Sequence, residues 1–183
     1  MRALTTIVVG VAILAACADG HSRGSAIRER FSLPTTDRQR IVADVEYTVA
    51  LLVSPECRAC TDTSFKAQWR RVRDGLAAQA KAANAVPAFI GVGVTWSIED
   101  GLVLLSGFEG LDEIAVGSSW LNVGFEEFAD YGFPSRHAVP QIVVVRKRRT
   151  LDSTGTHLEE KALLHRSIGL TEIRTWAERG APL

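Results

Sequence analysis

Beyond residue 41, short unbroken apolar runs alternate along the chain with longer stretches in which apolar residues recur at helical spacing. The runs are rich in β-branched residues and lack strict alternation, which is typical of strands buried on both faces. We expect strands at Tyr47–Val53, Ala88–Trp96, Glu113–Val116, Gln141–Val145 and Lys161–Ile168. We expect helices that start at Cys57, Ile98 (to Phe108), Val123 (to Tyr131) and Thr171 (to Arg179). This order predicts an α/β fold, a central mixed sheet flanked by helices that ends in an antiparallel hairpin.

The helix expected after Cys57 carries one apolar stripe. Phe65, Trp69, Val72 and Leu76 follow one another at intervals of four, three and four residues, which places them on one helical face. The last helix is expected to begin at Thr171, because threonine is a good N-cap residue. The stripe predicts that the first of these helices has one buried face.

The first residues have the pattern of an export signal. The small and apolar run Ala3–Ala16 follows Arg2, and at 1.5 Å per residue it is too short to cross a bilayer core of about 30 Å. Leu14-Ala15-Ala16-Cys17 resembles the lipobox of bacterial lipoproteins. The resemblance implies a signal peptide at residues 1–16, a lipid on Cys17, and a location on the extracytoplasmic side of a bacterial membrane. Cleavage of an ordinary signal peptide is the alternative.

The composition of the chain after the signal peptide limits the kinds of function that we expect. Residues 17–40 are polar and lack periodicity, so we interpret them as a flexible linker to a domain at residues 41–183. Lysine plus arginine and aspartate plus glutamate number 21 each, and this balance argues against nucleic-acid binding. The basic run Arg146–Arg149 is interpreted as the charged end of the hairpin, with contact to anionic headgroups as the alternative.

Cys57 and Cys60 form the one pattern with direct chemical meaning. Their spacing puts both sulfurs on one face of the first turn of a helix, where free amide groups favour a thiolate. A thiolate attacks a disulfide, and a second cysteine within reach resolves the mixed disulfide. Zinc sites share this spacing, but a structural zinc ion needs four ligands, and only two cysteines remain if Cys17 is lipidated. A structural disulfide between the two cysteines remains open.

The segment from Val49 to Cys60 resembles the first active-site strand and turn of the thioredoxin superfamily. Ala138-Val139-Pro140-Gln141 resembles the cis-proline loop of that superfamily and the strand after it. The resemblance implies a thioredoxin-like fold with an inserted segment before the proline, at Glu99–Leu121. It also implies a redox-active Cys57–Cys60 disulfide, a cis Val139–Pro140 bond beside it, and substrate pairing with the Val139 backbone.

Three features depart from the pattern of the superfamily, and one of them is the Arg58-Ala59 pair, which replaces Gly-Pro between the cysteines. The tryptophan that often precedes the first cysteine is Glu56 here, and the buried acid six residues before that cysteine is Leu51. Arg58 should stabilise a Cys57 thiolate and Glu56 should destabilise it, so both residues are expected to tune the site.

These features predict an envelope thiol–disulfide oxidoreductase in which Cys57 attacks and Cys60 resolves. Its expected partners are protein thiols or disulfides, a redox partner and the membrane, without any cofactor beyond the disulfide. The alternative is a non-catalytic lipoprotein with a thioredoxin fold that binds a partner protein or a metal ion. In that case His137 would join Cys57 and Cys60 in a three-ligand site for copper or zinc; no metal site is otherwise predicted.

Overall fold

The computed structural model describes residues 45–119, 122–129, 137–152 and 155–183. The expected signal peptide, lipidated Cys17 and linker lie outside these residues. Among the described residues, no helix is both long and apolar enough to cross a membrane. The elements are, in chain order, β1 (Val45–Val53), α2 (Arg58–Thr61), α3 (Thr63–Ala82), β2 (Val86–Gly93), α4 (Ile98–Leu105), β3 (Glu113–Val116), α5 (Val123–Ala129), β4 (Gln141–Asp152), β5 (Gly155–Ile168) and α6 (Gly169–Glu178).

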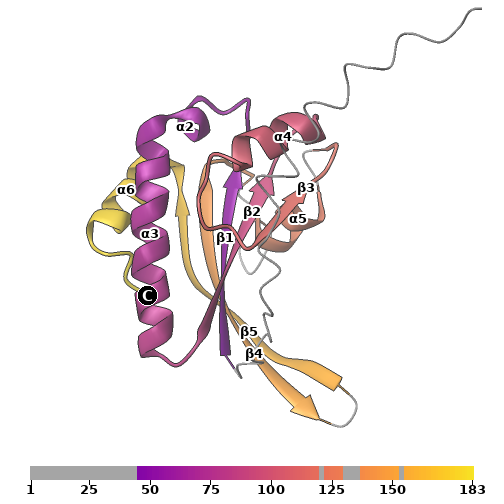
Figure 1. Cartoon of the computed structure of the whole chain (residues 1–183), viewed down its shortest axis with the longest axis vertical. Helices are drawn as coiled ribbons and strands as arrows, with labels where there is room; N and C mark the ends of the chain where they lie inside the picture. Colours follow the sequence, from indigo (N-terminus) through magenta and orange to yellow (C-terminus); the bar gives the residue numbers. More distant parts are fainter. Residues whose placement is uncertain (1–44, 120–121, 130–136, 153–154) are drawn as a thin grey trace, which may run out of the picture. The chain divides into compact units, whose positions relative to one another are not determined.

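The five strands form one mixed sheet in the order β3-β2-β1-β4-β5 (Figure 1). β1, β2 and β3 are parallel, whereas β4 is antiparallel to β1 and β5 is antiparallel to β4. The predicted α/β class, with a mixed sheet and a final antiparallel hairpin, is therefore confirmed. Val53 pairs with Gly93, and Leu52 pairs with Gln141. The ends of β1 and β2 and the start of β4 thus meet at one sheet edge, which we call the upper edge from its place in Figure 1.

Apolar side chains fill both sides of the sheet. Val49 and Leu51 of β1 pack in one cluster with α3, α4 and α6, and this cluster includes the predicted stripe from Phe65 to Leu76. Ala50 and Leu52 pack in a second cluster with α5. Because successive side chains of a strand point to opposite faces, a β1 covered on both sides must be apolar at every central position.

Two glycines of β2 let α4 lie close to the sheet. A Cβ atom on Gly91 would stand 2.8 Å from Leu105 Cδ2 of α4, and one on Gly93 would stand 3.4 Å from Leu105 Cδ1 and 3.5 Å from Gly101 Cα of the same helix. The helix therefore covers β2 where larger residues would push it outward. As a result, α4 and its N-terminal loop are held beside the upper edge of the sheet.

The helix expected to start at Cys57 is in fact two helices. Asp62 has extended dihedral angles, φ −66° and ψ 132°, and ends the single turn of α2. Its carboxylate then accepts a hydrogen bond of 2.7 Å from Ser64 N and caps the start of α3. In a continuous helix the Ser64 amide would donate its hydrogen bond to a backbone carbonyl of the preceding turn. The Asp62 side chain accepts that hydrogen bond instead, which favours the start of a new helix at this position.

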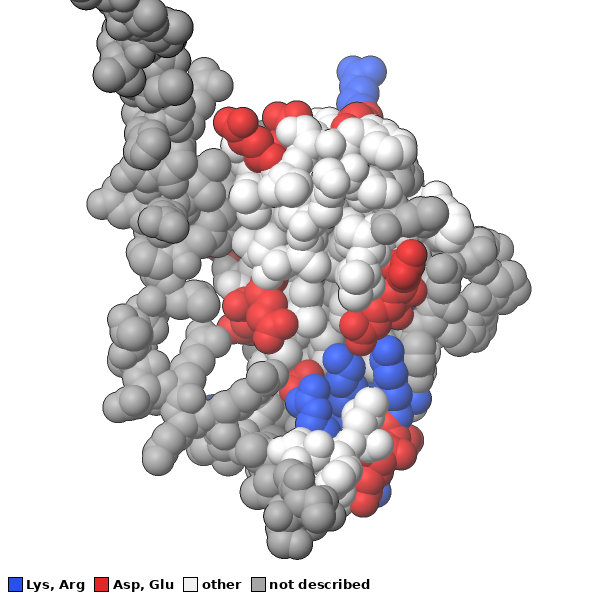
Figure 2. All heavy atoms as spheres, turned by 90° about the vertical axis from the view of Figure 1, so that its right-hand side faces the viewer, with Lys and Arg blue, Asp and Glu red and all other residues white. Residues whose placement is uncertain are grey.

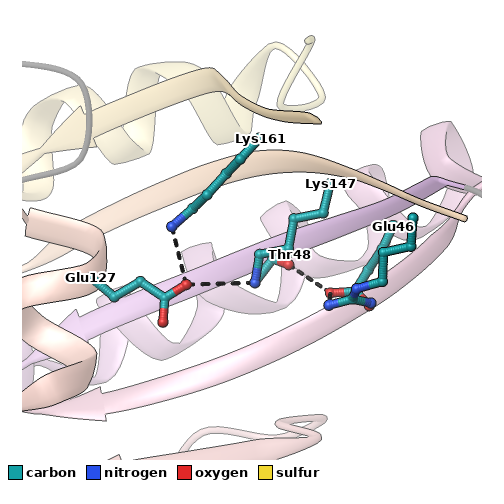
Figure 3. A network of polar contacts seen from close by, with 6 residues as sticks. Glu46, Thr48, Glu127, Lys147 and Lys161 are labelled. Atoms are coloured by element: carbon teal, nitrogen blue, oxygen red, sulfur yellow. Dashed lines mark hydrogen bonds and ion pairs between the residues drawn. The ribbon is translucent and has the colours of Figure 1, made fainter. Parts of the chain in front are cut away.

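The hairpin is longer than predicted, because the basic run continues β4 instead of ending it. Each base of the run forms an ion pair with a glutamate. Lys147 and Lys161 both approach Glu127 Oε1, at 3.6 and 3.2 Å (Figure 3). The remaining pairs are Arg146–Glu160, Arg148–Glu160 and Arg149–Glu46. These cross-strand pairs make charged residues compatible with a long two-stranded ribbon.

Several predicted element ends also shift. Strand β2 spans Val86–Gly93 rather than Ala88–Trp96, and α4 ends at Leu105 rather than Phe108. The predicted end of α5 at Tyr131 lies outside the described residues. Thr171 is not an N-cap: α6 begins at Gly169, and the Glu172 carboxylate accepts a hydrogen bond from Ile168 N at 2.9 Å. The Glu172 side chain thus reaches back to the backbone amide that precedes the helix, and the helix starts without a hydrogen bond from a threonine hydroxyl.

Candidate functional site

The two cysteines lie on a tight turn at the upper edge of the sheet, directly after β1. Cys57 N donates a hydrogen bond of 3.2 Å to Ser54 O, and Cys60 N donates one of 2.9 Å to Cys57 O. Cys57 is the N-cap residue of α2 and Cys60 lies within that helix. The structure thus brings Cys57 and Cys60 together on one helical turn, in the arrangement expected from their spacing.

The two thiols have different surroundings. Both are free, but Cys57 is half-buried, whereas Cys60 is fully buried within the apolar cluster under α3. Burial, followed by hydrogen bonding to Cys57, raises the pKa of the Cys60 thiol far above its ordinary value, although the Ser54 backbone opposes this shift. At neutral pH the Cys60 sulfur is therefore protonated and shielded, and the Cys57 sulfur is the one that solvent reaches.

The loop before β4 lies against the outer cysteine. The Val139–Pro140 bond is cis, as the resemblance implied. Cys57 Sγ donates a hydrogen bond of 3.4 Å to Val139 O. Gly169 N donates one of 2.8 Å to Pro140 O, which ties this loop to the start of α6. Residues 82 positions apart in the sequence are thus neighbours at the upper edge of the sheet.

Glu56 joins the ends of two strands. Its carboxylate accepts hydrogen bonds from Ser54 Oγ and, at 3.3 Å, from Thr95 Oγ1. Ser54 and Thr95 are both fully buried. The hydrogen bond from Ser54 is the largest cause of a pKa of Glu56 below its usual value, with Thr95 adding to the effect against partial burial. The Glu56 carboxylate is therefore ionised at neutral pH, and it lies on the residue that immediately precedes Cys57.

Sequence reasoning placed Glu56 near the thiols but missed Ser54 and Thr95. No local pattern distinguishes a serine and a threonine that happen to end two neighbouring parallel strands. Arg58 is exposed on α2, next to Cys57, and Leu51 is a fully buried apolar residue of β1. The order of the strands in space is what brings Thr95 to Glu56.

The structure does not assemble the alternative metal site. Among the residues that it describes, no group of three or more histidine, cysteine, aspartate or glutamate side chains is arranged to hold a metal ion. His137 is exposed, and its ring lies 5.4 Å from that of Phe125. The three-ligand set of Cys57, Cys60 and His137 is thus absent from this described part.

Comparison with known proteins finds a likeness at the level of structure. No protein-family model matches the chain, and no curated protein matches it in sequence. Among solved structures, the chain is similar to a candidate thiol:disulfide interchange protein, DsbE, from Chlorobium tepidum. The TM-score is 0.40 and the sequence identity is 14%, over 76% of this chain and 80% of that chain. The mixed sheet, the final hairpin and the cis Val139–Pro140 bond beside the Cys57–Cys60 turn agree with the α/β arrangement that the sequence resemblance implied.

Proposed function

We propose that the protein is a thiol–disulfide oxidoreductase of the bacterial cell envelope. The observation that carries this proposal is the asymmetry of the cysteine pair. Cys57 is accessible and lies against the Val139 carbonyl, while Cys60 is buried one helical turn behind it. An exchanger needs one sulfur that meets the substrate and a second that reacts only after the first is occupied.

In the reducing direction, the Cys57 thiolate attacks one sulfur of a substrate disulfide. A bond forms between Cys57 and that sulfur, and the other substrate sulfur leaves as a thiolate and takes up a proton. Cys60 then loses its proton and attacks Cys57 Sγ, which releases the second substrate thiol and leaves a Cys57–Cys60 disulfide. Two electrons pass to the substrate, and a dithiol partner protein returns them. With an oxidising partner, the same steps run in reverse.

The test is to trap the intermediate with a defined substrate. Full-length Cys60→Ser is incubated, in the reduced form, with a disulfide-bonded test peptide. It should accumulate a mixed disulfide through Cys57, because the resolving thiol is absent. Cys57→Ser, the matched control, should accumulate almost no adduct on the dithiol, because Cys60, the thiol that remains there, is buried. Mass spectrometry of the adduct identifies the linked cysteine. Lack of a Cys57 adduct in the first variant would contradict the proposal.

The membrane location is proposed on the lipobox-like sequence at Cys17. Cys17→Ser should remove the acyl mass from the N-terminal peptide and move the protein out of the membrane fraction. The trapping result should remain the same, because Cys17 lies outside the dithiol. A wild-type protein without an acylated N-terminal peptide would refute the anchor while leaving the redox function standing.

A further inference from the structure

Large apolar side chains are exposed in the segments that follow β2 and that begin α4 and α5. Trp96 is 67% exposed, Ile98 is 49% exposed and Val123 is 80% exposed. Thr95, the neighbour of Trp96, donates its hydroxyl hydrogen bond to Glu56, which precedes Cys57. Asn122 Nδ2 donates a hydrogen bond of 2.9 Å to Gly93 O, which places the start of α5 at the end of β2. These contacts place Trp96 and the start of α5 at the carboxyl ends of β1 and β2, and the Cys57–Cys60 turn follows the same end of β1.

The chain segment that builds this border has an unusual charge pattern. From Ala82 to Ser135 the sequence contains eight acidic residues and no lysine, arginine or histidine. Glu99 and Asp100, in the first turn of α4, are exposed next to Ile98. On the face in Figure 2, acidic side chains stand among uncharged ones in the upper half. The basic side chains in this view gather mainly lower down.

The basic residues Arg58 and Lys66 lie outside the acidic segment. Arg58 is on α2, and Lys66 of α3 lies 5.9 Å from the Phe108 ring, beyond the C-terminal end of α4. Glu127 of this segment pairs with Lys147 and Lys161, whereas Glu99 and Asp100 form no ion pair with any residue that the structure describes. Glu99 and Asp100 therefore keep their negative charge available at the surface.

We propose that Trp96, Ile98, Glu99, Asp100 and Val123, here called the α4 surface, bind a basic and apolar segment of the substrate protein. This inference rests on the proposed function and names its substrate class: polypeptides whose reacting cysteine is flanked by lysine or arginine and by large apolar residues. The exposed indole and aliphatic groups remove apolar substrate side chains from water. The acids attract the bases and disfavour acidic sequences, which sets specificity and association rate.

The test compares two peptides that differ only in flanking charge. Each has one cysteine in the same mixed disulfide with 2-mercaptoethanol, flanked by leucine and either two lysines or two glutamates. Reduced full-length protein is mixed with each peptide, and the second-order rate constant of exchange is followed by acid quench and mass spectrometry. We expect the basic peptide to react about tenfold faster at low ionic strength. This ratio should approach one at about 1 M salt, where the Debye length is about 3 Å.

The variants locate the effect on the surface. Glu99→Gln/Asp100→Asn should reduce the ratio of the two rate constants to about threefold or less. Its helix cap is kept, because Asp100 contributes its backbone N–H to Ser97 Oγ. Glu109→Gln/Glu113→Gln removes the same charge from exposed positions of the same segment beyond the C-terminal end of α4, and should keep the ratio. Trp96→Ala should slow the leucine-flanked basic peptide more than a serine-flanked one.

The outcomes separate the inference from the proposed function. Equal rate constants for the two peptides would overturn the inference while exchange itself stands. The same would follow if Glu109→Gln/Glu113→Gln lowered the ratio as much as the pair on α4. Absence of exchange with both peptides would refute the proposed function, and the substrate class would fall with it.

Discussion

The ion pair between Arg149 and Glu46 should stabilise the fold far more than the ion pair of the neighbouring Arg148 with Glu160. The Glu46 side chain is 8% exposed and that of Arg149 is 27% exposed. The contact joins the start of β1 to β4. The first residue of β4, Gln141, directly follows the Val139–Pro140 bond. Replacing Arg149 with leucine keeps much of the apolar stem but leaves a buried carboxylate without its main cation.

The magnitude follows from burial and from the partners that remain. Removing one member of a fully buried ion pair costs about 3–5 kcal/mol, whereas an exposed pair contributes about 0–1 kcal/mol. Glu46 still accepts a hydrogen bond of 2.8 Å from Thr48 Oγ1, and Arg149 is partly exposed. We therefore expect Arg149→Leu to lower the free energy of unfolding by about 2 kcal/mol.

Urea unfolding of the reduced protein measures this loss. With a slope of about 1.5 kcal/mol per M, the midpoint should fall by about 1.3 M. The matched control is Arg148→Leu, one residue earlier on the same strand. Arg148 is 51% exposed and lies 3.6 Å from Glu160, so we expect a loss below about 0.5 kcal/mol. Equal losses in the two variants would refute the reasoning, as would a loss below about 0.5 kcal/mol for Arg149→Leu.

Three further predictions address the thiols and the pH dependence. Limiting iodoacetamide should label Cys57 before Cys60, because Cys60 is buried and its pKa is raised; peptide mapping that finds Cys60 labelled first would reverse the assigned roles. Glu56→Gln removes a negative charge beside Cys57 and should speed its alkylation at neutral pH about two- to fivefold, whereas an unchanged rate would exclude Glu56 from tuning the site. For Glu46, burial raises the pKa, but the hydrogen bonds and charges of Thr48, Arg149 and Lys147 lower it by more than burial raises it. The pKa of Glu46 therefore lies below its ordinary value of 4.5. The unfolded state thus binds more protons in acid, so stability should fall as pH drops below about 4.5 in wild type and fall less in Glu46→Gln, as measured by urea midpoints at each pH.

The elements that depend on local pattern were predicted closely from the sequence. The stripe from Phe65 to Leu76 is buried along α3, and β3 spans Glu113–Val116 as expected. Periodicity reports burial directly, because a helix or strand with one covered face repeats its apolar residues at its own period. The Cys57–Cys60 turn was found the same way, since both its spacing and the preceding strand are local. The cis bond before Pro140 came from the resemblance, and the structure confirms it.

What the sequence determined by itself was therefore the order of elements, the apolar face of each, and a cysteine pair at the start of a helix. Tertiary structure decided which residues meet. It brought Val139 to Cys57, placed Thr95, which follows β2, within hydrogen-bond distance of Glu56, and left the neighbouring Trp96 exposed. It also paired the basic run with Glu46, Glu127 and Glu160, which extends the hairpin past its predicted end. The physical reason is that periodicity records whether a side chain is covered, whereas its hydrogen-bond partner depends on strand order and register, which are set by contacts between distant segments.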